Sequence, residues 1–253
     1  MGRNVLLDHY APIFLSSLLF ALATLFPILN PPAVAPIFLS LTEGASLATR
    51  AALAKRIALN ALMMLVIAMT LGHIVLAFFG ISLAIVRVGG GMLVIASAWR
   101  LVNSPDGGTG HAAQLAEPFT SEMARARAFY PLTFPISCGP GTIAAAITVG
   151  ASLRDDQTAT SMVRLAGSLP ALLLVSFSLF LCLRFAARFL HKLGESGTAV
   201  FMRLSAFILL CLGVQIVWDG ISELLLQWLV RAGVAPAGAP SPLSFLLGKV
   251  IAS

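Results

Sequence analysis

The sequence predicts an all-α integral membrane protein with six transmembrane helices. Its 253 residues are 58% hydrophobic and only 10% charged, whereas soluble domains average about 45–50% apolar and about 25% charged residues. The apolar residues form long runs that do not alternate with polar residues, as the strands of a membrane barrel would. In lipid, a helix satisfies its own backbone hydrogen bonds. The outer surface is therefore expected to contact the lipid bilayer.

Six windows of the chain are long enough to span a membrane, which requires about 20 mostly apolar residues. The first and the last window are longer than one span needs, so these two helices are expected to be tilted or broken. The predicted spans are residues 11–41, 57–79, 81–102, 130–153, 162–183 and 199–230.

The positive charges between these windows predict an orientation, because Lys and Arg are enriched in cytoplasmic loops. Nine of them follow the first, third and fifth windows, and five lie on the side of both termini. Both termini are therefore expected outside the cytoplasm. A cleaved signal peptide is the alternative for the N-terminus, but the apolar run continues to Leu41. The nine are Arg50, Lys55, Arg56, Arg100, Arg125, Arg127, Arg184, Arg188 and Lys192, and the five are Arg3, Arg154, Arg164, Arg231 and Lys249.

A short motif occurs twice, once in each half of the chain. Residues 26–33 read Phe-Pro-Ile-Leu-Asn-Pro-Pro-Ala and residues 134–141 read Phe-Pro-Ile-Ser-Cys-Gly-Pro-Gly, an offset of 108 (134 − 26). Each motif lies in the first window of a group of three, so the two halves would enter the membrane in opposite directions. This 3+3 inverted repeat is a common plan of secondary transporters. We assign the first repeat to residues 1–102, a cytoplasmic polar linker to 103–128, the second repeat to 129–230 and a C-terminal tail to 231–253.

Both motifs are expected to break their helices, since proline lacks an amide donor and clashes with the preceding turn. Paired broken helices indicate a binding site near the bilayer midplane. Helix N-termini after Pro32 and Pro140 would favour a carboxylate, and free carbonyls before each break would favour an ammonium group or a cation. The alternative is a pair of kinks that only shape packing. The predicted substrate-binding residues are Asn30, Pro31, Pro32, Thr133, Ser137, Gly139, Pro140, Gly141 and Thr142.

Four ionisable residues inside the windows are candidates for charge or ion coupling. Arg87 and Arg203 occupy corresponding positions of the two halves, and each is expected either to face the cavity or to extend to the headgroups. His73 is a candidate proton relay or a neutral, hydrogen-bonded histidine. Asp219, four residues before Glu223, would bind a coupling proton or cation, or the pair marks where the helix leaves the membrane.

Several other classes of function are not expected. The pI of about 9.9 comes without a basic stripe and interleaved aromatics, so nucleic acid is not an expected partner. Cys138, Cys182 and Cys211 have no metal-ligand spacing and are interpreted as small buried hydrophobes. No metal or other cofactor is expected. The windows contain no arrangement typical of an intramembrane enzyme, and no ATP-binding motif is present, so energy would come from an ion gradient.

The motifs together resemble the MarC family of bacterial inner-membrane proteins. The resemblance is carried by residues 26–31 with 36–42, by Gly80-Ile81-Ser82 followed by residues 87–91, and by residues 131–135 with 139–143. It extends from about residue 15 to 222. Where the family usually has Asn-Pro-Ile or Asn-Pro-Val, this chain has Asn-Pro-Pro. The resemblance implies six helices, an inner-membrane location and transport of small neutral amino acids, and with this location the charge count predicts that both termini are periplasmic.

The leading hypothesis is therefore a secondary transporter or exporter of a small polar metabolite, acting by alternating access between the two breaks. The rival hypothesis is a non-transporting membrane protein, such as an assembly partner or a lipid-handling factor, in which side chains fill both breaks. Self-association into a homo-oligomer is compatible with either hypothesis. The three glycines at 89–91 are expected to let another helix approach closely.

Overall fold

The computed structural model describes residues 2–103, 127–154 and 157–232, and every regular element in these residues is a helix. Five spans are long and apolar enough to cross a membrane, and a bent pair of helices makes a sixth if it is counted as one span. The prediction of an all-α membrane protein is thereby confirmed. Most of the predicted linker, 104–126, and of the predicted tail, 233–253, lies outside the described residues.

The first half of the chain contains four helices, which are α1 (Gly2–Leu29), α2 (Pro31–Leu41), α3 (Leu47–Phe78) and α4 (Leu83–Val102). Together, α1 and α2 provide one span, Tyr10–Leu41. The starts of α3 and α4 are capped by Ser46 and Ser82, whose hydroxyls accept hydrogen bonds from amides three residues later. Serine caps a helix in this way because its oxygen replaces a missing backbone acceptor.

The second half contains η1 (Ala128–Ser137), α7 (Pro140–Ser152), α8 (Thr158–Arg184) and α9 (Ala186–Arg231). The η1 segment has wide, irregular turns that depart from helical geometry at Tyr130 and Phe134, each of which precedes a proline. This departure is expected, since proline disfavours a helical conformation at the residue before it. A bend of 69° separates η1 from α7. Gly194 interrupts α9, so its membrane span is Ser196–Arg231.

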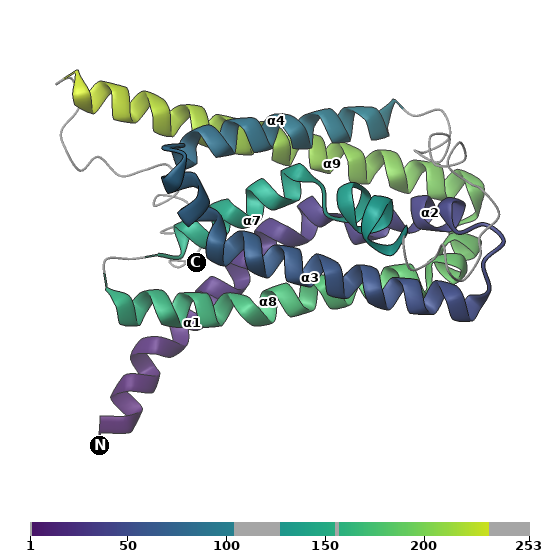
Figure 1. Cartoon of the computed structure of the whole chain (residues 1–253), viewed down its shortest axis with the longest axis horizontal. Coiled ribbons are helices and arrows are strands. Elements are labelled where there is room, and N and C mark those ends of the chain that lie inside the picture. Colours follow the sequence, from purple (N-terminus) through teal and green to yellow (C-terminus); the bar gives the residue numbers. More distant parts are fainter. Residues whose placement is uncertain (1, 104–126, 155–156, 233–253) are drawn as a thin grey trace.

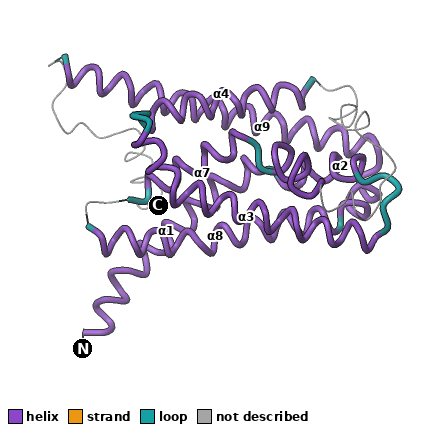
Figure 2. Tube along the Cα trace, in the orientation of Figure 1, coloured by secondary structure: helices purple, strands orange, loops and turns teal. Residues whose placement is uncertain are grey.

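The spans run side by side as a bundle, which Figures 1 and 2 show from the same direction. α4 packs along α9 and α1 along α8, while α3 contacts both α7 and α8. We call the end of the bundle where α1 begins and α9 ends the terminal side. The opposite end, where α2, α4 and α8 end, is the linker side. Broken helices α1–α2 and η1–α7 belong to this bundle, and each is interrupted within its length, at Asn30 and at residues 138–139.

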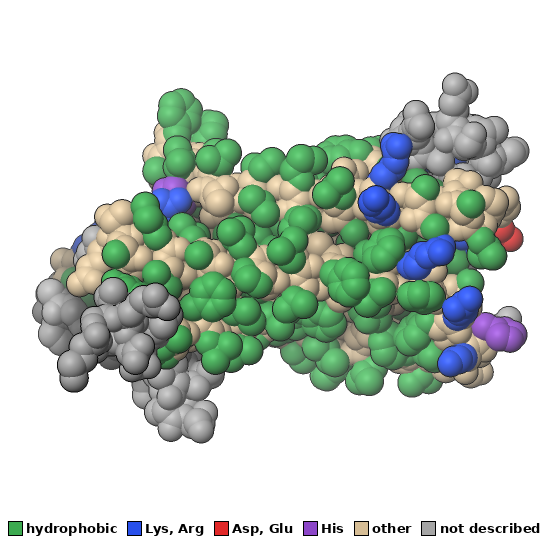
Figure 3. All heavy atoms as spheres, turned by 90° about the horizontal axis from the view of Figure 1, so that it is seen from below, with side chains coloured by type: hydrophobic (Ala, Val, Ile, Leu, Met, Phe, Trp, Pro, Cys, Tyr) green, Lys and Arg blue, Asp and Glu red, His purple; other side chains and the backbone are tan. Residues whose placement is uncertain are grey.

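The surface of the bundle matches a membrane environment. Hydrophobic side chains cover the middle of the face in Figure 3, and Lys and Arg gather mainly toward the linker side. Exposed large hydrophobic residues occur along every long span, for example Ile67, Leu173 and Phe207. Contiguous exposed apolar surface of this extent is not found on soluble monomers. The bilayer is therefore the partner of this surface.

Glycines bring the helices of the interior into close contact. A Cβ atom added at Gly90 would collide with Ala144 of α7, and one at Gly91 would lie 2.9 Å from the carbonyl oxygen of Gly213 in α9. α4 is therefore wedged between α7 and α9 at backbone distance. The glycine run thus acts in helix packing, as expected for small residues at membrane helix contacts.

Candidate functional site

The break between α1 and α2 consists of one residue. Asn30 has φ 47° and ψ 59°, in the left-handed region, and no other non-glycine residue among those described has a positive φ. Asparagine adopts this conformation more readily than most residues because its short polar side chain is compatible with it. The Asn30 side chain does not cap α2. The left-handed backbone at the break therefore explains why an asparagine occupies position 30.

The two prolines after Asn30 leave carbonyl groups of α1 without donors. Pro31 and Pro32 have no amide hydrogen, and the amide of Ala33 donates to the Asn30 carbonyl oxygen at 3.0 Å instead of continuing the α1 pattern. An electron-rich helix end of this kind favours a cation or an ammonium group. At the end of α1, the carbonyls of Pro27, Ile28 and Leu29 have no donor among the described residues.

The break before α7 offers the opposite chemistry. Pro140 is the first residue of α7, and the amide of Ile143 donates to the Gly139 carbonyl oxygen at 3.1 Å. The amides of Gly141 and Thr142 have no acceptor within the described residues, and no side chain caps this helix. Free amides at a helix N-terminus favour an anionic group. Of the two predicted anion-binding helix ends, only the one at α7 provides free donors, because prolines occupy the first two positions of α2.

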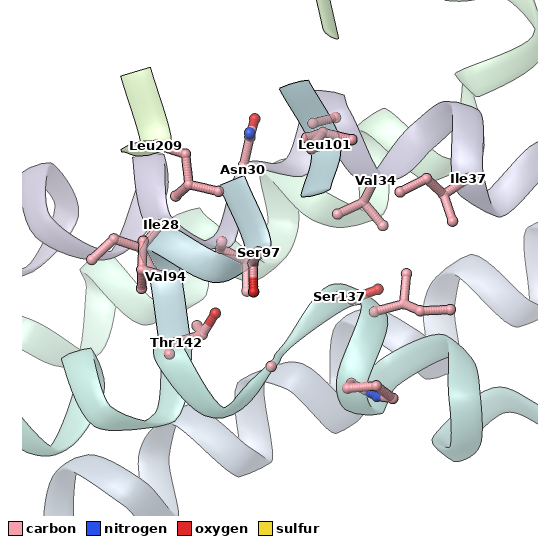
Figure 4. A pocket seen from close by; sticks show the side chains of 16 residues that line it. Ile28, Asn30, Val34, Ile37, Val94, Ser97, Leu101, Ser137, Thr142 and Leu209 are labelled. Atoms are coloured by element: carbon pink, nitrogen blue, oxygen red, sulfur yellow. The ribbon is translucent and has the colours of Figure 1, made fainter. Parts of the chain in front are cut away.

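A cavity of about 170 Å³ lies between the two breaks. For comparison, an engineered cavity of about 150 Å³ in another protein holds benzene, so this space is suited to a molecule of roughly six to eight non-hydrogen atoms. Figure 4 shows Ser97 from one wall and Ser137 and Thr142 from the other. The cavity is lined by Ile28, Leu29, Asn30, Ala33, Val34, Ile37, Val94, Ser97, Leu101, Pro135, Ile136, Ser137, Gly139, Gly141, Thr142 and Leu209.

Five of the nine predicted substrate-binding residues line this cavity, namely Asn30, Ser137, Gly139, Gly141 and Thr142. The Thr142 hydroxyl has no hydrogen-bond partner among the described residues, whereas the Ser137 hydroxyl donates to the Leu132 carbonyl at 2.7 Å. In Figure 4 the Asn30 carboxamide is directed away from Ser137 and Thr142. Thr142 is therefore the side chain most available to a ligand.

The other four residues of the prediction act on the backbone or in packing. Pro31, Pro32 and Pro140 form the breaks but do not line the cavity. Thr133 is completely buried, and its hydroxyl donates to the Ala128 carbonyl at 2.7 Å within η1. The carboxamide of Asn60 in α3 lies 3.4 Å from the same hydroxyl. Thr133 thus connects η1 to α3 and does not face the cavity.

Sequence reasoning missed the wall that α4 and α9 contribute. Val94, Ser97 and Leu101 of α4 and Leu209 of α9 line the cavity, although no motif distinguishes them. Spacing of three and four residues places the three α4 positions on one helix face. This spacing, together with the polar Ser97 inside an apolar window, is the only local signal that could have identified the three α4 residues.

Arg87 neither faces the cavity nor extends to the headgroups. It is buried, with 6% of its surface exposed, and its guanidinium forms an ion pair with Glu223 of α9. A second nitrogen of the guanidinium donates to the Ser152 hydroxyl of α7 at 3.3 Å. Both sequence interpretations failed here because the partner that neutralises Arg87 lies 136 residues away in the sequence. For the same reason Glu223 does not merely mark where α9 leaves the membrane.

The remaining three candidates for coupling also lie outside the cavity. Arg203 is exposed on α9 and thus differs from its counterpart Arg87. His73 is half-buried in α3, and its buried Nδ1 has no hydrogen-bond partner. Asp219 accepts a hydrogen bond from the Gln215 carboxamide at 2.8 Å.

These features define a polytopic membrane protein with a small cavity between two broken helices, lined mostly by apolar side chains and by a few polar groups. Residues 15–225 match the MarC family of integral membrane proteins, and the chain belongs to that family. It is 29% identical to the UPF0056 inner membrane protein MarC of Escherichia coli O1:K1 over 211 residues, which is 81% of this chain and 93% of the relative. It is 32% identical to a UPF0056 membrane protein of Archaeoglobus fulgidus over 85% of this chain and 96% of the relative. No solved structure matches it.

The family assignment confirms the resemblance inferred from the motifs. Since the relatives from Escherichia coli are named inner membrane proteins and this chain has several membrane-spanning helices, we assign it to the membrane. The names of these relatives state no substrate.

Proposed function

We propose that this protein is a secondary transporter or exporter of a small zwitterionic metabolite, such as a small neutral amino acid, which binds between the two breaks. The observation that carries the proposal is the opposite polarity of the two helix ends at one cavity. Unsatisfied carbonyls of Ile28 and Leu29 lie on the α1 side, and the free amides of Gly141 and Thr142 lie on the α7 side. A zwitterion satisfies both ends at once.

In the proposed complex, the substrate carboxylate accepts hydrogen bonds from the Gly141 and Thr142 amides and from the Thr142 hydroxyl. The ammonium group donates to the carbonyls at the end of α1. Such unpaired backbone groups are costly in lipid and are tolerated beside a cavity. The volume of about 170 Å³ limits the side chain of the substrate to a few atoms, and the apolar residues Val34, Val94 and Leu209 would contact it.

Alternating access follows from the 3+3 inverted repeat, which is part of the same proposal. Its support is the correspondence of contacts between the halves: α4 packs on α9, and α3 packs on α8, each pair being equivalent in the repeat. Moreover, α3 contacts η1 and α7, and its equivalent in the second half, α8, contacts α1 and α2, the equivalents of η1 and α7. In such transporters one half of the protein rocks against the other around a fixed site. The substrate would be moved without chemical change, driven by an ion gradient.

Ligand binding to the purified protein tests the proposal. Thermal unfolding in detergent is followed with a panel of small amino acids, their amides and their decarboxylated amines. A ligand at about 100 times its Kd stabilises the protein by about 2.7 kcal/mol. We expect stabilisation by small amino acids only, since the amides and amines lack the carboxylate. Uptake into proteoliposomes under imposed proton or sodium gradients then tests transport.

Thr142→Val is the variant that decides where the ligand binds, because it removes the hydroxyl and preserves the shape of the side chain. We expect the stabilisation by ligand to fall at least severalfold. Ser178→Ala is the matched control, since Ser178 lies in α8 and its hydroxyl donates only to the Val175 carbonyl. Equal ligand responses in Thr142→Val and the wild type would contradict the site. Absence of any response would favour the non-transporting alternative, in which the breaks serve assembly or lipid handling.

A further inference from the structure

The cavity and the Arg87–Glu223 pair lie at different depths of the same helices. Along α4, the cavity residue Val94 is seven positions from Arg87, or about 10 Å at 1.5 Å per residue. Along α9, Leu209 is 14 positions from Glu223, or about 21 Å. Along α7, Thr142 is ten positions from Ser152, or about 15 Å. In all three helices the displacement is toward the terminal side.

Between the cavity and this pair, α4, α7 and α9 are packed at backbone distance. Gly90 contacts Ala144 of α7, and Gly91 contacts Gly213 and Val217 of α9. One turn further toward the terminal side, a Cβ atom added at Gly220 would lie 2.8 Å from the Ala84 carbonyl oxygen. These contacts leave no room for a substrate to pass while they persist. The route from the cavity to the terminal side between α4, α7 and α9 is therefore closed in this structure.

The ion pair fastens the same three helices at the end of this closed region. Arg87 comes from α4, Glu223 from α9, and Ser152, which accepts a hydrogen bond from Arg87, from α7. The Ser152 hydroxyl in turn donates to the Thr148 carbonyl at 2.9 Å. Gly220 makes room for the arginine, since a Cβ atom there would lie 3.0 Å from the Arg87 Cβ. The Nε atom of Arg87 is buried without a hydrogen-bond partner.

We propose that the Arg87–Glu223 pair, with Ser152, is a gate that closes the substrate cavity on the terminal side and must separate for the cavity to open there. This inference rests on the proposed transport function and adds a gate on the terminal side. The Arg87 side chain is buried and that of Glu223 is partly exposed, and such an ion pair has two discrete states, joined or apart. Removal of the Glu223 charge leaves Arg87 buried without its counter-charge, and removal of the Arg87 charge likewise breaks the pair, so the closed state loses its main polar contact.

Access of a thiol reagent to the cavity tests the gate without requiring transport. In a chain with Cys138, Cys182 and Cys211 replaced by alanine, Ser97→Cys places one reporter in the cavity wall. A membrane-impermeant charged thiol reagent is then applied from the terminal side. We expect slow labelling when the Arg87–Glu223 pair is intact. In Arg87→Gln and Glu223→Gln we expect labelling roughly tenfold faster, because loss of a contact made only in the closed state raises the population of the open state.

Two further variants keep the test decisive if a single neutral substitution prevents folding. The exchange Arg87→Glu with Glu223→Arg restores an ion pair and is expected to return the labelling rate toward that of the intact gate. Glu223→Asp retains the charge but withdraws the carboxylate by one methylene, and it is expected to give an intermediate rate. Arg203→Gln is the matched control, because Arg203 is an exposed arginine on the same helix as Glu223.

The outcomes separate this inference from the proposed function. Faster labelling in the two neutral variants, restored by the exchange and absent in Arg203→Gln, supports the gate even if no transport is measured. Unchanged labelling in Arg87→Gln, Glu223→Gln and Glu223→Asp overturns it, even if the protein transports amino acids. Equal acceleration in Arg203→Gln also overturns it, because the effect would then reflect loss of any positive charge.

Discussion

Single residues at the two breaks have roles that follow from backbone chemistry. Asn30 is suited to a left-handed conformation, and Pro31 and Pro32 remove amides that would otherwise complete the end of α1. Gly139 is extended, so its role does not depend on a positive φ. Thr142 differs from all of these because its hydroxyl and amide are both unengaged among the described residues. Thr142 can therefore offer a ligand two hydrogen-bond donors, its backbone amide and its hydroxyl.

Adjacent glycines in α4 are expected to respond differently to the same substitution. A Cβ atom at Gly89 meets nothing within 4 Å, whereas one at Gly90 collides with the Ala144 side chain. Gly89→Ala should therefore leave stability unchanged or raise it by up to about 1 kcal/mol, from helix propensity. Gly90→Ala should lower it by about 1–3 kcal/mol, from overpacking. Thermal unfolding in one detergent compares the two, and equal effects would show that α4 is not wedged against α7.

At the scale of elements, the two broken helices are not equivalent. The α1–α2 span is interrupted at one residue, whereas η1 and α7 are bent by 69° after irregular turns. Both breaks leave carbonyls without donors among the described residues, and only the start of α7 also supplies free amides. An inverted repeat with identical breaks would give two similar helix ends. The additional proline at position 32 removes an amide donor from the start of α2. Free amides therefore lie only at the start of α7.

Replacement of both prolines tests this asymmetry. In Pro31→Ala with Pro32→Ala, the new amides can reach the carbonyls of Pro27 and Ile28, as in a continuous helix. We expect loss of stabilisation by the ligand, because the new amides compete with it for these carbonyls, and little change in thermal stability, because proline is tolerated in the first turn of a helix. Pro36→Ala is the control, because Pro36 lies inside α2 and does not line the cavity. A full ligand response in the double variant would exclude a role of the α1 carbonyls.

For the whole molecule, the distribution of charge predicts an orientation in the membrane. Described loops of the linker side and their flanking helix ends carry Arg50, Lys55, Arg56, Arg100, Arg127, Arg184, Arg188 and Lys192. Because Lys and Arg are enriched in cytoplasmic loops, this distribution predicts that the linker side lies inside the cell. The terminal side, with the Arg87–Glu223 pair, would then face outward. The cavity lies between the sides and belongs to neither.

Reagent access from outside the cell measures this orientation. In a chain without its native cysteines, Glu43→Cys probes the loop after α2 and Gln157→Cys the start of α8. We expect an impermeant maleimide to label position 157 in intact cells, and position 43 only after permeabilisation. The reverse pattern would place both termini in the cytoplasm and would invert the direction assigned to the gate.

Properties that depend on neighbouring residues along the chain were determined by the sequence alone. Hydropathy predicted the five long spans, and the bent pair η1–α7 occupies the sixth predicted window. Most span limits lie within a few residues of the prediction, because apolar length is a local property, but α3 begins ten residues before its window, at Leu47. The positions of both breaks were predicted for the same reason, since proline acts on its own turn and the preceding one. Five of the nine predicted binding residues line the cavity because they belong to these breaks.

Only the tertiary structure decided which distant segments meet. Val94, Ser97 and Leu209 became part of the cavity through the packing of α4 and α9 against the breaks. Arg87 acquired Glu223 as its partner across 136 residues, which no local pattern encodes. The environment of a buried charge depends on the counter-charge within a few ångströms. Helix packing therefore decided that Arg87 is buried and paired and that Arg203 is exposed, although the two correspond in the sequence.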